Sequence, residues 1–97
     1  MAQWHDLTAL EQGAAVATGE VSPRELVEHF AGREDRVGAF VTRTTEQALA
    51  RADALAAAGR PADAGPLWGV PTAIKDLNAT AGVRTTFGAK RFEHYVP

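Results

Sequence analysis

Apolar residues recur at helical spacing in three segments of the chain, and polar or glycine-containing stretches separate these segments. Side chains three or four residues apart lie on the same face of a helix, so each segment is predicted to form an amphipathic helix. The expected helices cover about 6–18, 22–33 and 45–58. Their apolar positions are Leu7, Leu10, Ala14 and Ala17, then Leu26, Val27 and Phe30, then Leu49, Ala52 and Leu55.

The start of the second helix has the strongest local signal. Ser22 can accept a hydrogen bond from the backbone N–H of Glu25, and the Glu25 side chain can reach back to the Ser22 N–H. Pro23 suits the first helical position, because no backbone donor is needed there. Candidate boundary residues elsewhere are Asp6 or Thr8 and Gly19 for the first helix, and Thr44 or Thr45 and Gly59 for the third.

Two other segments have the composition of β-strands. Residues 37–42 are rich in β-branched and aromatic side chains, and residues 70–75 are mostly apolar but too short for a helix. Pro71 has no backbone N–H, which restricts the second strand to a sheet edge or a strand start. A strand-helix-strand order suggests parallel strands with a right-handed crossover. We therefore expect an α/β fold in which helices accompany about two strands of a mixed sheet.

That sheet would be incomplete. Two strands do not form an independently stable sheet, and their outer edges would lack hydrogen-bonding partners. Further strands must come from a C-terminal region, a partner chain or self-association. Residues 61–66 are expected to form a linker, and residues 78–97 a loop with a helical turn near 90–94. The 97 residues are thus expected to be one part of a larger domain.

Composition excludes several classes of protein. Ten basic and twelve acidic residues give a net charge of −2, and the arginines are scattered, so we expect no direct nucleic-acid contact. The absence of cysteine excludes a disulfide framework and a cysteine nucleophile. No apolar run approaches the roughly 20 residues that span a bilayer. The first twenty residues carry three acids and no Lys or Arg, unlike a secretory signal. We expect a cytoplasmic protein without a membrane partner.

Familiar catalytic and binding motifs are missing. His5, His29 and His94 are far apart in the sequence and form no metal-binding pattern, so we expect surface or capping histidines. No glycine-rich nucleotide-binding motif is present. The only serine, Ser22, is used as a helix cap. We therefore expect no metal, no cofactor and no nucleophile in this chain.

Lys75 is the side chain of this sequence that is best suited to acid–base catalysis. It is one of only two lysines and lies at the end of the most apolar predicted strand. Desolvation disfavours an ammonium, and the resulting neutral amine can act as a general base toward a hydroxyl. The alternative is that Lys75 reaches water from an edge strand and pairs with Asp76. Adjacent strand residues point to opposite faces, so Asp76 need not neutralise the lysine.

The sequence around Lys75 resembles the amidase signature family. GPLWGVPTAIKD at 65–76 is similar to the family pattern GPLxG(I/V)PxxxKD, and AGVRTTFG at 81–88 is similar to its AGxxTTxG block. Upstream, the helix that opens at 22–27 and the segment 39–41 are also similar to the start of that family. The resemblance covers nearly the whole chain and is confined to the N-terminal portion of the family's domain, an α/β/α fold.

The resemblance implies an enzyme that hydrolyses or transfers amide groups through a Ser–cis-Ser–Lys triad, with Lys75 as its lysine. In that family the lysine takes a proton from the bridging serine, which activates the nucleophilic serine. Both serines come from a Gly/Ser-rich segment well downstream, and this chain contains nothing like it. The chain would therefore supply only the lysine, would be inactive alone, and would act on a small-molecule amide within the complete protein.

Two alternatives stay open. The chain could be a non-catalytic interaction module that binds a partner, or a second copy of itself, through an exposed sheet edge. It could also be a piece of a tRNA-dependent amidotransferase, whose amide-cleaving component resembles this family and works with partner proteins. The sequence does not distinguish hydrolase from amidotransferase, and it does not specify the amide.

Overall fold

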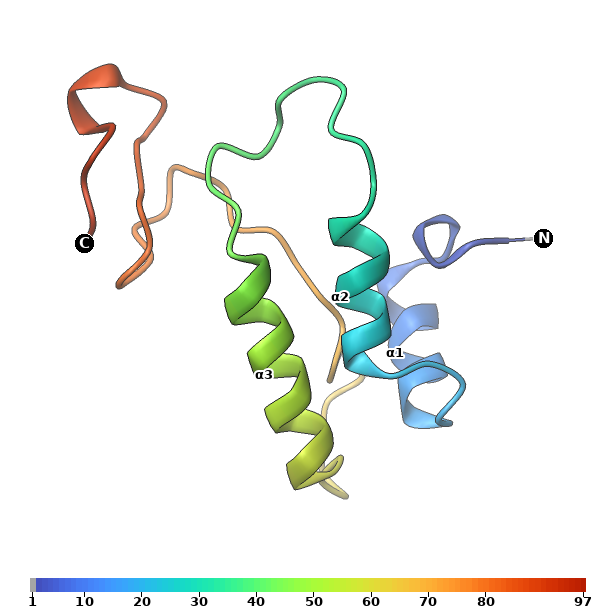
Figure 1. Cartoon of the computed structure of the whole chain (residues 1–97). Coiled ribbons are helices and arrows are strands. Elements are labelled where there is room, and N and C mark those ends of the chain that lie inside the picture. The colour runs from blue at the N-terminus through green and yellow to red at the C-terminus, as the bar shows by residue number, and fades with distance from the viewer. Residues whose placement is uncertain (1) are drawn as a thin grey trace. The chain divides into compact units, whose positions relative to one another are not determined.

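The computed structural model describes residues 2–97, which divide into two compact units. One unit comprises the residues up to Glu34 together with Thr44–Pro71, and we call it the helical unit. The other comprises Asp35–Arg43 and Thr72–Pro97, and we call it the loop unit. Figure 1 shows that the three α-helices belong to the first part of the chain and to its middle, while the C-terminal third is largely irregular.

The helical unit contains η1 (Trp4–Asp6), α1 (Ala9–Ala17), α2 (Pro23–Ala31) and α3 (Thr45–Ala58). The three α-helices lie inside the ranges predicted from apolar spacing. Thr8 caps α1, because its hydroxyl accepts from the Glu11 N–H at 3.1 Å and its own N–H donates to the Glu11 carboxylate at 2.9 Å. The same reciprocal pair joins Ser22 and Glu25 at the start of α2, at 3.0 and 3.1 Å.

A small apolar core holds the helical unit together. Leu26 of α2 is completely buried and packs with Ala15 and Val16 of α1 and with Val21. Helix α2 also packs against α3, where Ala52 is buried (Figure 1). On the surface of that helix pair, the Arg24 guanidinium lies 2.6 Å from the Asp53 carboxylate. Three half-buried aromatic side chains complete the core, namely Trp4, Phe30 and Trp68.

Residues 61–66, which were expected to be a linker, belong to the helical unit and pack against α1. A Cβ atom at Gly13 would lie 1.9 Å from the Pro66 carbonyl oxygen, so the close approach requires glycine at this position. Gly69 has φ +83, and a Cβ there would lie 3.0 Å from Val16 and from Pro23. The segment after α3 therefore runs closely along the first two helices.

The loop unit contains no α-helix, and its one regular element is the short η2 (Lys90–Phe92). No β-strand occurs anywhere in residues 2–97. The expected strands at 37–42 and 70–75 are therefore wrong, and so is the α/β fold class: the described chain is helical and irregular. None of its helices combines the length and apolarity that a bilayer crossing requires.

Local hydrogen bonds explain why the two apolar segments are not strands. The Asp35 carboxylate accepts from the N–H groups of Ala39 and Phe40, at 2.9 and 3.1 Å, and closes a turn where strand pairing was expected. The extended stretch before Lys75 ends where the Asn78 N–H donates to the Lys75 carbonyl oxygen at 3.0 Å. A strand needs a neighbour for its backbone groups, and neither segment finds one within the described residues.

Candidate functional site

Lys75 lies in the loop unit, on an extended segment between Pro71 and the turn that begins at Asp76. Its side chain is exposed. The desolvated environment expected for this amine is therefore not formed within residues 2–97, and the strand that was expected to carry it at 70–75 is absent there. No ion pair joins Lys75 to Asp76 within residues 2–97, because the Asp76 carboxylate faces a different partner.

That partner is Thr86, ten residues further along the chain. One Asp76 carboxylate oxygen, Oδ2, accepts from the Thr86 hydroxyl, and the other, Oδ1, accepts from the Thr86 N–H at 2.7 Å. The bond from the Thr86 hydroxyl, and to a smaller extent the bond from its N–H, hold the pKa of Asp76 below its ordinary value, because both bonds favour the ionised carboxylate. The Gly88 N–H and the positive charge of Arg84 act in the same direction. The KD and TT blocks of the sequence thus form one local structure.

The threonine pair itself is the buried centre of the loop unit. Thr85 is 2% exposed and Thr86 is 5% exposed. The Thr85 N–H donates to the Tyr95 carbonyl at 3.0 Å, and its hydroxyl donates to the Val83 carbonyl at 3.0 Å. The Thr86 hydroxyl also accepts from the Gly88 N–H at 3.2 Å. Both buried hydroxyls therefore have partners, as buried polar groups require.

Arg84, next to this pair, joins the two chain segments of the loop unit. Its guanidinium donates to the Thr42 hydroxyl at 3.1 Å and to the Val41 carbonyl at 3.4 Å. It also donates to the carbonyl of Glu93. Residues 35–43 are thereby attached to the part of the chain that carries Lys75.

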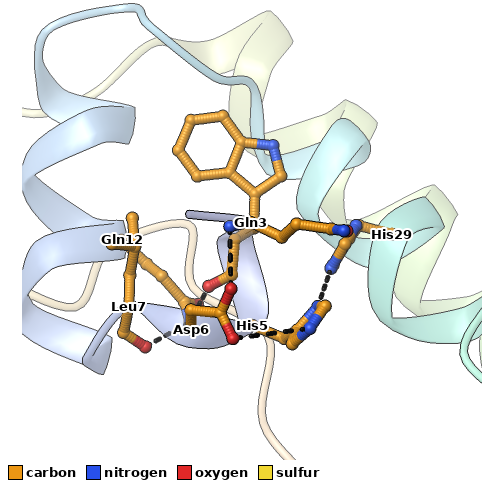
Figure 2. Close-up of polar contacts among 7 residues, drawn as sticks. Gln3, His5, Asp6, Leu7, Gln12 and His29 are labelled. Atoms are coloured by element: carbon orange, nitrogen blue, oxygen red, sulfur yellow. Dashed lines mark hydrogen bonds and ion pairs between the residues drawn. The ribbon is translucent and has the colours of Figure 1, made fainter. Parts of the chain in front are cut away.

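Two histidines that are distant in the sequence meet in the helical unit. Figure 2 shows His5 of η1 and His29 of α2 pointing toward each other, with Nδ1 of the first 2.8 Å from Nε2 of the second. The rings stack with their centroids 5.1 Å apart, and the Asp6 carboxylate lies 3.6 Å from the other nitrogen of His5. The sequence interpretation treated these as separate histidines. No cluster of three or more His, Cys, Asp or Glu suited to a metal occurs in the described chain.

A shallow depression of about 310 Å³ lies elsewhere in the helical unit, between η1 and α1. Apolar and acidic side chains line it, including Trp4, Leu7 and Glu11. It contains neither Lys75 nor the histidine pair, and it is open to solvent. We assign no chemistry to it.

Sequence reasoning proposed Lys75 as the site residue and gave Asp76 only the role of a neighbouring charge, and it assigned no role to Thr86 or Arg84. The one available signal was that an acid and a threonine pair occur in two blocks of the same family pattern. A hydrogen bond across ten residues of irregular chain has no periodicity from which it could be predicted.

Comparison with known proteins supports the family. The sequence model of the family described as Amidase matches residues 24–97. The chain is 45% identical over 96 residues to the A subunit of Glutamyl-tRNA(Gln) amidotransferase from Thioalkalivibrio sulfidiphilus, a match that covers 95% of this chain and 20% of that protein. The protein of the same name from Acinetobacter baylyi is 39% identical over 100 residues, covering 99% and 20%. That from Alkalilimnicola ehrlichii is 42% identical over 95 residues, covering 94% and 20%.

No solved structure matches this chain. The chain spans about a fifth of the length of the curated relatives that it matches. The family match includes both the KD block at Lys75 and the TT block at Thr86, which the structure joins by hydrogen bonds. The resemblance inferred from these blocks is therefore confirmed, and the chain belongs to the amidase family.

Proposed function

We propose that this chain is part of an amidase that breaks carboxamide C–N bonds, and that it contributes the triad lysine, Lys75, without the nucleophile. The observation that carries the proposal is the pair of hydrogen bonds between Asp76 and Thr86. These bonds bring the two most specific blocks of the family pattern together directly beside Lys75. Family membership supports the same assignment.

Lys75 and Asp76 are consecutive, so the bonds at Asp76 hold the backbone on which the lysine is carried. In the proposed reaction, the neutral Lys75 amine accepts a proton from a bridging serine hydroxyl, which accepts one from a nucleophilic serine. The nucleophilic serine attacks the amide carbonyl, the C–N bond breaks, and the nitrogen leaves as ammonia after protonation. Water then hydrolyses the acyl ester to a carboxylic acid. Both serines are supplied by the part of the protein downstream of this chain.

The exposure of Lys75 supports the proposal that the chain is inactive alone. An amine in contact with water is favoured as the ammonium, and burial by a covering segment favours the neutral base. Ile74 and Leu77, on either side of the Lys75–Asp76 pair, are 61% and 60% exposed. Apolar side chains at these positions suit a partner surface that excludes water from the lysine. We propose that the downstream part of the amidase is this partner, and that a small-molecule amide is the substrate, without direct nucleic-acid or membrane contact.

A second candidate function is a part of an amidotransferase. The names of the three relatives favour it, because each is called a component of Glutamyl-tRNA(Gln) amidotransferase. An amidotransferase releases ammonia from an amide in the same first half-reaction and then delivers it to a second acyl group. The two candidates are distinguished by whether the ammonia appears in solution or in a new amide.

In the experiment, this chain replaces the matching N-terminal fifth of the Thioalkalivibrio relative. Ammonia release by this chimera is then measured with several carboxamides, including glutamine. We expect turnover by the chimera, none by the isolated 97-residue chain, and at least about a 1,000-fold loss of kcat in the Lys75→Ala chimera, the cost of losing a triad member. Lys90→Ala is the matched control, because Lys90 is the other lysine and is also exposed. A folded chimera without turnover, or full turnover after Lys75→Ala, would contradict the proposal.

A further inference from the structure

The backbone around Lys75 is held on its C-terminal side by two independent sets of hydrogen bonds. The Asn78 N–H donates to the Lys75 carbonyl oxygen at 3.0 Å, which closes a turn directly after the lysine. Within this turn, the Asp76 carboxylate accepts both bonds from Thr86. The Lys75 side chain itself is exposed. Its placement is therefore set through the backbone.

Thr86 is suited to hold this backbone because it is fixed itself. It is 5% exposed, and its hydroxyl both donates to Asp76 and accepts from the Gly88 N–H at 3.2 Å. The neighbouring Thr85 is attached through its N–H to the Tyr95 carbonyl at 3.0 Å. The threonine pair thus links the lysine turn to two other stretches of the loop unit. The hydroxyl of Thr86 serves both the Asp76 bond and the Gly88 bond.

We infer that Thr86, acting through the Asp76 carboxylate, is a positioning residue for Lys75 in the amide-cleaving reaction. This inference rests on the proposed function, in which Lys75 is the base. Proton transfer requires hydrogen-bond distance between the amine and its serine, and a displacement of about 1 Å in such a site can cost about 100-fold in rate. In this role the acid of the KD block anchors the backbone that carries Lys75.

The test compares two substitutions of Thr86 in the chimera described above. Thr86→Ser keeps the hydroxyl, and Thr86→Val keeps the shape but removes the hydroxyl. We expect kcat to fall about 10- to 100-fold in the valine variant with KM changed less than about threefold, and to stay within about threefold of the parent in the serine variant. Thr44→Val is the control for loss of a threonine hydroxyl, because Thr44 is exposed and makes no side-chain capping bond.

The helical signal in circular dichroism separates positioning from a loss of folded protein. A smaller folded fraction lowers kcat in proportion to the helical signal that is lost, whereas a displaced amine lowers kcat with the signal unchanged. We expect the Thr86→Val chimera to keep the helical signal of the parent. Equal kcat in the valine and parent chimeras, or an equal loss of kcat in the serine and valine variants, overturns the inference.

The outcomes for Lys75 and Thr86 are distinguishable from one another. If Lys75→Ala abolishes turnover and Thr86→Val does not reduce it, the proposed function stands and the positioning role is wrong. If Lys75→Ala retains turnover, the proposed function fails first, and the positioning role fails with it. The two substitutions therefore need to be measured in the same chimera and at the same pH values.

Discussion

The helical unit and the loop unit are stabilised by different forces. The six buried residues that form the apolar core of the described chain all lie in the helical unit, with Leu26 and Val21 the most deeply buried. In the loop unit the buried residues are Thr85 and Thr86, and large apolar side chains such as Val37 and Ile74 stay exposed, at 86% and 61%. One unit is thus built on apolar burial, whereas the other combines hydrogen bonds with mutual ring contacts of Phe87, Phe92 and Tyr95.

This difference indicates what each unit is suited to do. Burial of apolar surface contributes roughly 1.5–3 kcal/mol for each fully buried large side chain, whereas a typical hydrogen bond contributes a net of about 0.5–1.5 kcal/mol. Hydrogen bonds, however, are directional and can fix one backbone position relative to another. The loop unit uses them to hold the segment that carries Lys75, while its large apolar side chains stay exposed.

The largest expected effect is the loss of the core of the helical unit. Leu26→Ala removes a completely buried side chain, so we expect the free energy of unfolding to fall by about 3 kcal/mol. Urea denaturation of the 97-residue chain, followed by circular dichroism at the helical band, measures it. Leu10→Ala is the control, because Leu10 is 62% exposed, and its effect should stay below about 0.5 kcal/mol. Equal effects would mean that apolar burial does not distinguish these positions.

A second substitution tests the packing of residues 61–66 on α1. In Gly13→Ala the new Cβ would lie 1.9 Å from the Pro66 carbonyl oxygen, so either the helix or the segment must move. We expect a loss of about 2 kcal/mol, even though alanine is the better helix former by about 1 kcal/mol. Gly65→Ala is the matched control, because no atom lies within 4 Å of its added Cβ. A stabilised Gly13→Ala variant would show that this close approach does not exist.

A smaller effect is expected at the helix starts. Ser22→Ala removes the hydroxyl that accepts from the Glu25 N–H, and we expect the loss of about 1 kcal/mol that is typical of an N-cap. Thr44→Ala is the comparison, because Thr44 precedes α3 without a side-chain capping bond. Its denaturation midpoint should barely change. Similar losses in the two variants would argue against the cap at Ser22 as the cause.

The smallest effect on overall stability is expected from acid, which protonates Asp76 in the loop unit and also Glu11 at the cap of α1, whose pKa is lowered by its hydrogen bonds with Thr8. The pKa of Asp76 is lowered by the Thr86 hydroxyl and N–H, so its contribution is present above the unfolded value of about 3.9 and is lost as pH falls through the folded value below it. The amide signals of Thr86 and Gly88 should therefore shift in NMR spectra below about pH 4, while the helical signal changes less.

Asp76→Asn is the control for the acid titration. The amide group cannot lose or gain the proton in question, so the Thr86 amide signal of this variant should not titrate in that range. Asp35 is a second carboxylate of the loop unit whose pKa is lowered, in its case by the N–H groups of Ala39 and Phe40. If the Thr86 signal titrates equally in the Asn variant, Asp35 or another acid is responsible.

The helix starts and the family could be predicted because their signals are local. The hydrogen bonds of Ser22 and Glu25 span three residues, and the KD and TT blocks are read directly from the sequence. Gly19, expected to end the first helix, has φ +80 one residue after the cap at Thr18. In each case the residue type and a neighbour within a few positions are sufficient.

The strands could not be predicted correctly because strand formation depends on a neighbour. Residues 37–42 have strand-like side chains, but the Asp35 carboxylate occupies the backbone donors of Ala39 and Phe40. The meeting of His5 with His29, 24 residues apart, was missed for a related reason. Contacts between distant segments leave no periodic pattern in a single sequence.

The sequence by itself determined the three amphipathic helices, the caps of the first two and the membership of the amidase family, because these follow from side-chain spacing and short motifs; the cap expected at Thr44 does not form. Only the tertiary structure decided that residues 37–42 and 70–75 form no sheet, that Lys75 is exposed, and that Asp76 binds Thr86. These features depend on which backbone and side-chain groups meet across longer stretches of chain, and local preference does not specify that.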